Sequence, residues 1–114
     1  MDRVFAALAD ATRRDIVMRV LAEESSVSGL ARRYDMSFAA VQKHVAVLER
    51  ARLVTKERRG REQVVRGDVD TVRAAGRLLA HLEELWRDRL GRFGDLLGEP
   101  PVPPVTDRPS GVAP

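Results

Sequence analysis

Residues 37–66, SFAAVQKHVAVLERARLVTKERRGREQVVR, decide the fold of this chain. The first part predicts an amphipathic helix over residues 38–50, because Val41, Val45 and Leu48 follow one another at steps of four and three. Two helices and a tight turn make a helix-turn-helix, and a basic hairpin after it makes a winged helix. We therefore predict a mainly helical fold with a small β-hairpin, a winged helix-turn-helix.

The second part of the stretch predicts two short strands, residues 54–58 and 63–66, on either side of a turn. Gly60 gives the tip of this turn its backbone freedom. The turn and its edges form a basic wing, residues 58–62, which would project toward phosphates or a minor groove. The basic side chains expected to contact DNA from this wing are Arg58, Arg59 and Arg61.

The net charge of +3 is unevenly distributed along the chain. Residues 32–66 carry ten Lys and Arg against four Asp and Glu, whereas residues 1–31 and 67–114 are slightly acidic. A local basic excess is what the neutralisation of DNA phosphates requires. A solvated charged face is the ordinary explanation of a basic run, but its coincidence with the helix and hairpin favours nucleic acid.

The exposed face of the helix over residues 38–50 carries side chains suited to reading bases. Gln42 can pair bidentately with an adenine edge, and Lys43 can reach guanine acceptors or a phosphate. The small or apolar side chains of Phe38, Ala39 and Ala40 would allow close approach and contact with thymine methyl groups. These features favour sequence-specific binding of double-stranded DNA.

Two further residues of this helix have both a DNA-binding and a structural interpretation. Ser37 and the first helical amides can hold a phosphate, although Ser37 can also be a simple N-cap. His44 can contact DNA or can be a half-buried histidine bonded to the scaffold.

Three helices are predicted upstream, over residues 3–9, 11–22 and 27–34, with a polar link at residues 23–26. Asp10 is the expected N-cap of the second of these helices. The third, a tight turn and the helix that follows would form the helix-turn-helix.

A long helix is predicted downstream, from about Val69 to Leu97. Its apolar residues recur at steps of three and four over more surface than one small domain can cover, so we predict a homodimer. The expected interface residues on this helix are Leu79, Leu82, Trp86, Leu90 and Phe93. A protein-interaction module that uses helix 69–97 is the alternative from another functional class.

The composition predicts one folded domain, residues 1–97, and a disordered tail, residues 98–114, where all six prolines lie. The absence of a membrane-length apolar run and of a leader predicts a cytoplasmic protein without a membrane partner. The absence of cysteine excludes disulfides and thiolate metal sites.

An enzyme is not expected. The only histidines are His44 and His81, and the chain has no cysteine nucleophile and no glycine-rich phosphate loop. No cofactor is expected either.

Three segments, FAALADATRRDIV (5–17), SVSGLARRYDMS (26–37) and AVQKHVAVLERARLV (40–54), together with the Arg-rich wing resemble the arsenical-resistance-repressor (ArsR/SmtB-type) family of winged-helix regulators. The resemblance covers about residues 4–97. It implies a dimer built by the first and last helices, which adds Val4 and Phe5 to the expected interface. It also implies binding to an inverted-repeat operator, usually by a repressor that an effector releases.

Three positions depart from the family pattern. The third helix lacks the cysteine pair with which many relatives bind metal, and Arg52 replaces the usual glycine after the recognition helix. A non-glycine residue in a left-handed conformation costs about 1 kcal/mol. The zinc set of some relatives becomes Asp68, Asp70, His81 and Glu84 here, with Asp70 in place of a histidine.

This set is a poor tetrahedral zinc site because it has three carboxylates and one imidazole. Asp68 and Asp70 can instead stabilise the start of the long helix. We therefore predict that the protein has no metal site. A metal-responsive repressor of the same fold, using Asp68, Asp70, His81 and Glu84, is the alternative.

Overall fold

The computed structural model describes residues 1–97 of the chain. It divides into two compact units, one of residues 1–75 and a second that begins at Gly76. The last helix, α5 (Val69–Leu97), contributes to both units. The Pro-rich tail expected at residues 98–114, and with it the predicted boundary after residue 97, lies outside the described residues.

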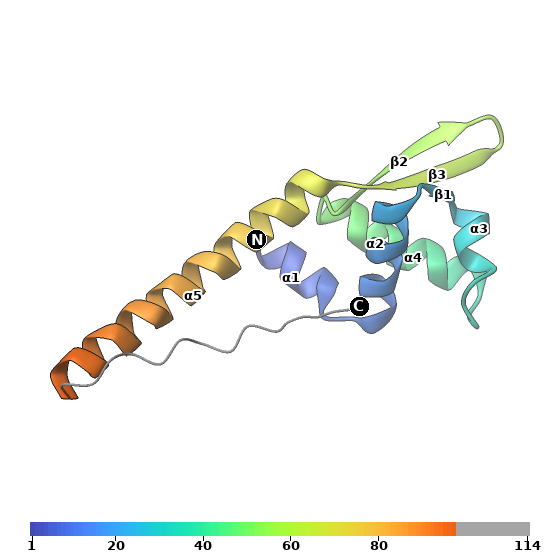
Figure 1. The fold of residues 1–114 in the computed structure, drawn as a ribbon. Helices are drawn as coiled ribbons and strands as arrows, with labels where there is room; N and C mark the ends of the chain where they lie inside the picture. Colours follow the sequence, from blue (N-terminus) through green and yellow to red (C-terminus); the bar gives the residue numbers. More distant parts are fainter. Residues whose placement is uncertain (98–114) are drawn as a thin grey trace. The chain divides into compact units, whose positions relative to one another are not determined.

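The first unit combines helices with a small antiparallel sheet, as a winged helix-turn-helix requires (Figure 1). Its complete helices are α1 (Asp2–Leu8), α2 (Ala11–Ala22), α3 (Val27–Ala31) and α4 (Phe38–Arg50), and its strands are β1 (Ser25–Ser26), β2 (Val54–Arg59) and β3 (Glu62–Gly67). The prediction of a mainly helical fold with a winged helix-turn-helix is therefore confirmed.

Side-chain caps fix where helices α2, α3 and α4 begin. Asp10, Ser26 and Ser37 each accept a hydrogen bond from the main-chain N–H three residues further on, at 3.0, 2.9 and 3.1 Å. Each cap satisfies an amide that has no partner within its own helix. The starts of α2 and α4 therefore fall at the predicted residues.

Helix α3 is shorter than its sequence pattern predicts. It ends at Ala31, whereas the pattern predicts an end near Tyr34. The N–H groups of Arg33 and Tyr34 bond to carbonyls three residues back rather than four. This tighter pattern is the usual way in which a helix turns into a loop.

The core of the first unit lies between the helices and the sheet. The predicted stripe of α4, which consists of Val41, Val45 and Leu48, is completely buried. It packs in one cluster with the other fully buried large residues, which are Ile16, Leu30, Leu53, Val54 and Val65. Helix α4 is thereby held by one face, and its opposite face remains available.

The sheet has a third strand that the sequence pattern does not predict. Its order is β1-β3-β2, with Ser25 opposite Val65 and Ser26 opposite Val64. The segment was expected to be a polar link, because two serines show no alternation of apolar and polar residues. Strand β1 forms through main-chain pairing with the edge of β3, and a third strand stabilises a hairpin that would be marginal alone.

The tip of the wing is tighter than predicted. The strands continue to Arg59 and from Glu62, so only Gly60 and Arg61 form the turn. Gly60 has a φ of +60°, a conformation that glycine adopts without steric cost.

The C-terminal end of α4 has the left-handed residue that the family pattern implies. Arg52 has a φ of +62°. The Arg52 N–H donates to the Glu49 carbonyl and the Leu53 N–H to the Leu48 carbonyl, each at 3.0 Å. These two bonds form a Schellman motif, which usually has glycine at the position that Arg52 occupies.

Replacing Arg52 with Gly is expected to raise the free energy of unfolding by about 1 kcal/mol, because glycine removes the steric cost of the left-handed conformation. Urea denaturation measures this change. Arg77→Gly, the same substitution at an exposed position inside α5 (Val69–Leu97), should instead lower it by about 1 kcal/mol. A loss of stability in Arg52→Gly would mean that contacts of the guanidinium outweigh the backbone strain.

The second unit begins within α5 and carries a large apolar surface. Leu79, Leu82, Leu85, Trp86, Phe93 and Leu96 each expose more than half of their surface. Exposed apolar residues that recur along one helix usually mark an interface. Within residues 1–97, no helix has the length and apolar character needed to cross a membrane.

Candidate nucleic-acid interface

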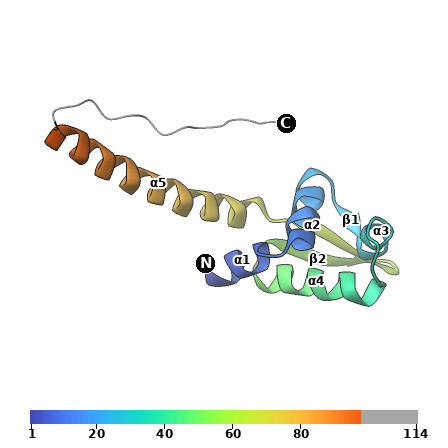
Figure 2. The same ribbon diagram turned by 90° about the horizontal axis from the view of Figure 1, so that it is seen from below.

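The exposed face of α4 carries the side chains predicted to read bases. Gln42, Lys43 and Ala39 are exposed, Phe38 is 46% exposed and Ala40 is partly buried. Helix α4 lies alongside β2 (Figure 2). Because its other face is anchored in the core, the helix presents its amide, ammonium and small apolar groups on a rigid support.

Ser37 lies at the N-terminal end of this face. Its hydroxyl accepts the Ala40 N–H, so it caps the helix, and the residue itself is exposed. The cap leaves the positive end of the helix open to an anion, so that the capping role and a phosphate contact are compatible.

His44 lies at the edge of the α4 face and leans toward α2. Its Nδ1 is 4.0 Å from Oδ2 of Asp10, and its side chain is 22% exposed. Asp10 also accepts the Arg13 N–H, which lowers the pKa of that carboxyl, and protonated His44 lowers this pKa further. This geometry favours the scaffold role of His44 over a contact with bases.

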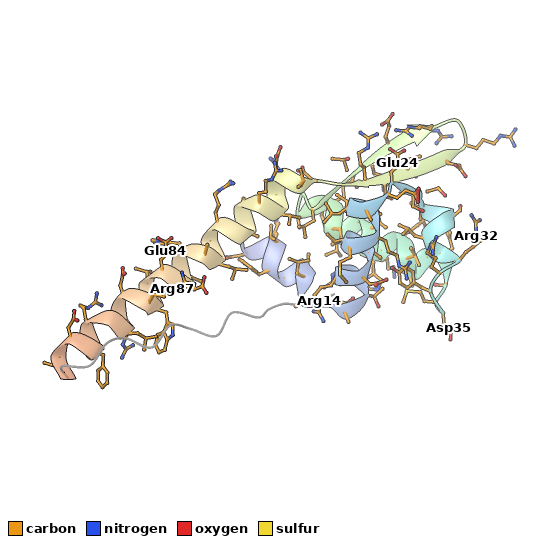
Figure 3. The ribbon with its side chains drawn as sticks, viewed as in Figure 1. Arg14, Glu24, Arg32, Asp35, Glu84 and Arg87 are labelled. Carbon is orange, nitrogen blue, oxygen red and sulfur yellow. The ribbon has the colours of Figure 1, made fainter. Side chains whose placement is uncertain are left out.

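The arginines of the wing fall into two groups. Arg59 pairs with Glu24 and, at 3.5 Å, with Glu57. Arg66 pairs with the same two carboxylates, at 3.5 and 3.3 Å. Glu24, which lies just before β1, is seen beside the hairpin in Figure 3. The hydrogen bond to Glu24 raises the pKa of Arg59 above its usual value, and the two ion pairs engage this arginine within the protein.

Arg58 and Arg61 form the second group. Both are exposed, and neither makes an ion pair with another side chain of residues 1–97. Side chains alternate along a strand, so Arg58 lies on the same face of β2 as Lys56. Lys56 pairs with Glu49 of α4 at 3.6 Å, and this places Arg58 on the side of the wing that faces α4.

Glu24→Gln is expected to strengthen binding to every DNA sequence by about two- to fivefold, because it releases Arg59 from an exposed ion pair of modest strength. Binding to unrelated duplexes at low salt measures this. Glu23→Gln is the matched control, since it makes the same charge change at the neighbouring residue. An equal gain in both variants would assign the effect to net charge rather than to Arg59.

Two arginines that could have contacted phosphate instead hold α1 in place. Arg13 donates to the carbonyls of Ala7 and Ala6 at 2.7 and 3.2 Å, and Arg14 donates to the carbonyl of Leu8 at 2.8 Å. Cations at the C-terminal end of a helix satisfy its free carbonyls and suit its dipole. Both side chains therefore serve the scaffold.

A polar cluster of Asp15, Arg19 and Tyr34, which the sequence pattern does not reveal, links α2 to the helix-turn-helix. The Tyr34 hydroxyl donates to Oδ2 of Asp15 at 2.6 Å, and Nε of Arg19 donates to the same oxygen at 2.8 Å. Burial and the Asp15 carboxylate raise the pKa of Tyr34 to about 12. The cluster ties α2 to the turn that leads from α3 to α4, across 19 positions of sequence.

The residues of the alternative metal site have other partners at the start of α5. Asp68 accepts the N–H groups of Asp70 and Thr71 at 3.0 and 3.3 Å, and so caps the helix. Oδ1 of Asp70 lies 3.8 Å from Nη1 of Arg73, with which it forms an ion pair. Within residues 1–97, no group of three or more histidines, aspartates or glutamates, including His81 and Glu84, is placed to hold a metal ion.

Known proteins share this architecture and sequence. Residues 10–56 match the bacterial regulatory protein, arsR family. The chain is 36% identical over 96 residues to the HTH-type transcriptional regulator Rv2034 of Mycobacterium tuberculosis, a match that covers 84% of this chain and 87% of that protein.

Two solved structures agree with this assignment. An ArsR-like transcriptional regulator from Rhodococcus sp. RHA1 is 32% identical with a TM-score of 0.75, covering 83% of this chain and 90% of that one. The ArsR family transcriptional regulator RHA00566 is 32% identical with a TM-score of 0.70, covering 75% and 88%. The chain therefore belongs to the ArsR family of DNA-binding, non-enzymatic helix-turn-helix transcriptional regulators.

Proposed function

We propose that the chain is a homodimeric repressor that binds an inverted-repeat operator in the cytoplasm. Each subunit would insert α4 into a major groove and rest its wing on the adjacent backbone. The observation that carries this proposal is the contrast between the two faces of α4. One is locked in the core, whereas the other presents Gln42 and Lys43 to solvent.

The proposed contacts divide into those that read bases and those that hold phosphates. Gln42 and Lys43 have the donors and acceptors needed to distinguish bases, and Ser37 and the wing arginines have the chemistry for phosphates. The full set of proposed DNA contacts is Ser37, Phe38, Ala39, Ala40, Gln42, Lys43, His44, Arg58, Arg59 and Arg61. His44 and Arg59 are the weakest members, because Asp10 and Glu24 already engage them.

The proposed dimer rests on the apolar face of α5. Two copies of this helix would bury each other's exposed side chains, with α1 contributing Phe5, which is partly buried in the single chain. Val4 is the weakest member of the proposed interface, because it is only 5% exposed and lies in the core of its own subunit. The interface residues on α5 are Leu79, Leu82, Trp86, Leu90 and Phe93. In a symmetric dimer the same patch meets itself, so that the two α4 helices are placed at a fixed separation that an inverted repeat can match.

Gln42→Ala tests this proposal most directly. It is expected to cost about 1–3 kcal/mol on the preferred operator and to relax the preference at one base pair per half-site. Arg61→Ala should instead weaken binding to all sequences alike and lower the slope of affinity against salt by about 1. Selection of bound duplexes from a random pool, followed by titration at several salt concentrations, measures both effects.

Arg73→Ala is the control for these two variants. Its side chain is 67% exposed on α5 and is not one of the proposed DNA contacts, so its removal should leave the operator profile unchanged. An operator profile that is identical in the parent protein and in Gln42→Ala would show that α4 does not read bases through this residue.

A further inference from the structure

We propose that a cavity at the C-terminal end of α4 binds a small organic anion, a carboxylate with an apolar body, and that this anion regulates DNA binding. The cavity has a volume of about 670 Å³ and lies within the first unit. Its walls come from the start of α1, the end of α4 and the start of α5, and its arginines are Arg3, Arg50 and Arg52. We refer to it as the arginine cavity.

The charges around the arginine cavity favour an anion. Three arginines and two aspartates, Asp2 and Asp70, line it, and Asp70 is already paired with Arg73. Within residues 1–97 the three arginines make no ion pair. A guanidinium is a planar fork that binds a carboxylate through two parallel hydrogen bonds, which makes three of them around one cavity a suitable receptor.

The size and floor of the cavity favour an organic anion over a bare ion. Val4 and Ala51 line it and are each only 5% exposed, which gives the cavity an apolar base. Its volume is within the roughly 300–1,000 Å³ that is typical of small-molecule sites. A second cavity of about 310 Å³ shares Arg3, Arg50 and Ala51 and extends toward Val47. A single phosphate would leave most of this space empty.

The backbone at Arg52 is a separate observation that points to the same site. This residue keeps a left-handed φ of +62° at a position where glycine would be unstrained. Strain of this kind concentrates at functional sites, where the side chain compensates for its cost. Here the residue that keeps this conformation is one of the three arginines that line the cavity.

The location of the cavity connects it with DNA binding. Arg50 and Arg52 lie at the end of the helix that would read bases, and Thr71 and Ala74 lie on the helix that would form the dimer. An anion held between them would change how α4 is oriented relative to the dimer axis. This regulatory part rests on the proposed function, whereas anion binding itself does not.

Calorimetric titration of the full chain without DNA tests the site. The probes are 2-naphthoate, its uncharged analogue 2-naphthamide, and inorganic phosphate, each to about 10 mM. We expect saturable binding of 2-naphthoate only. If the amide bound as tightly as 2-naphthoate, the negative charge of the ligand would not be required. If phosphate bound as tightly, the apolar part of the ligand would not be required. Benzoate and octanoate serve as a smaller and a more flexible carboxylate. If neither of them nor 2-naphthoate binds, the cavity is not a site for organic anions.

Three variants locate the binding. Arg50→Gln and Arg52→Gly are each expected to weaken 2-naphthoate binding by about ten- to a hundredfold. Arg33→Gln, at an exposed arginine that does not line the cavity, should leave it unchanged. Arg52→Gly is the sharpest of these, because it should raise Tm and lower anion affinity together. A higher Tm with unchanged affinity for 2-naphthoate would show that Arg52 does not contact the anion.

Operator binding with and without 2-naphthoate then tests regulation. We expect the anion to change operator affinity at least tenfold in the parent protein and not in Arg52→Gly. Anion binding with unchanged operator affinity would overturn the regulatory role and leave the site standing. A protein that binds the anion but no operator would instead refute the proposed function, so the two failures are distinguishable.

Discussion

Leu82→Asp is expected to convert the proposed dimer into monomers and to reduce operator affinity at least a hundredfold. Leu82 is 53% exposed in the single chain and lies on the apolar face of α5 that two subunits would bury together. Placing an unpaired carboxylate in such an interface costs several kcal/mol, more than a small helical interface can absorb. A monomer also loses the second half-site, whose contribution through effective concentration is on the order of 10²–10⁴.

Sedimentation velocity and operator titration measure these two losses. Arg77→Asp is the matched control, because at 100° per residue Arg77 lies opposite the face that contains Leu82. It introduces the same carboxylate on the same helix and should remain dimeric. A Leu82→Asp protein that still sediments as a dimer would place the interface on another surface.

Leu48→Ala is expected to lower the free energy of unfolding by about 2–5 kcal/mol. Leu48 is completely buried, and it is also the residue whose carbonyl accepts the Leu53 N–H at the end of α4. The truncation leaves a void between α4 and the sheet that a close-packed core cannot fill. The total free energy of unfolding of a small domain is only about 5–15 kcal/mol, so this loss would remove much of what holds α4 in place.

Urea denaturation at fixed protein concentration measures this loss, since the proposed dimerisation would contribute to stability. Met18→Ala is the control, because Met18 is 62% exposed on α2 and its truncation should change stability by less than about 0.5 kcal/mol. A loss below about 1 kcal/mol in Leu48→Ala would mean that the base-reading helix is held by something other than its apolar stripe.

The features that the sequence predicts well are local ones. Helix α4 runs over the predicted residues 38–50, because a side-chain cap and an apolar stripe within one short stretch determine its start and its buried face. The left-handed residue after it occurs at Arg52, where the family pattern has glycine. Patterns of this kind depend only on neighbours in the sequence, so they can be read without the fold.

The features that the sequence does not predict depend on distant partners. Strand β1 exists only because β3 lies beside it, and its two serines carry no strand pattern of their own. Glu24 and Arg59 are 35 residues apart, so no local rule identifies their pairing, which changes the expected role of an arginine in the wing. The arginine cavity is likewise assembled from three separate segments.

The attachment of β1 also bears on how regulators of this kind can diverge. The pairing of Ser25 and Ser26 with β3 uses main-chain groups, so the sheet itself requires no particular side chain here, whereas the Ser26 hydroxyl is needed to cap α3. Glu24 precedes this strand, is exposed, and pairs only with Arg59 and Arg66 of the hairpin among residues 1–97, so the acid at this position can change without disturbing α4. A mutation at position 24 can in this way adjust the affinity for all DNA sequences without changing which operator α4 would recognise. Adaptation to a new promoter then requires no change in α4.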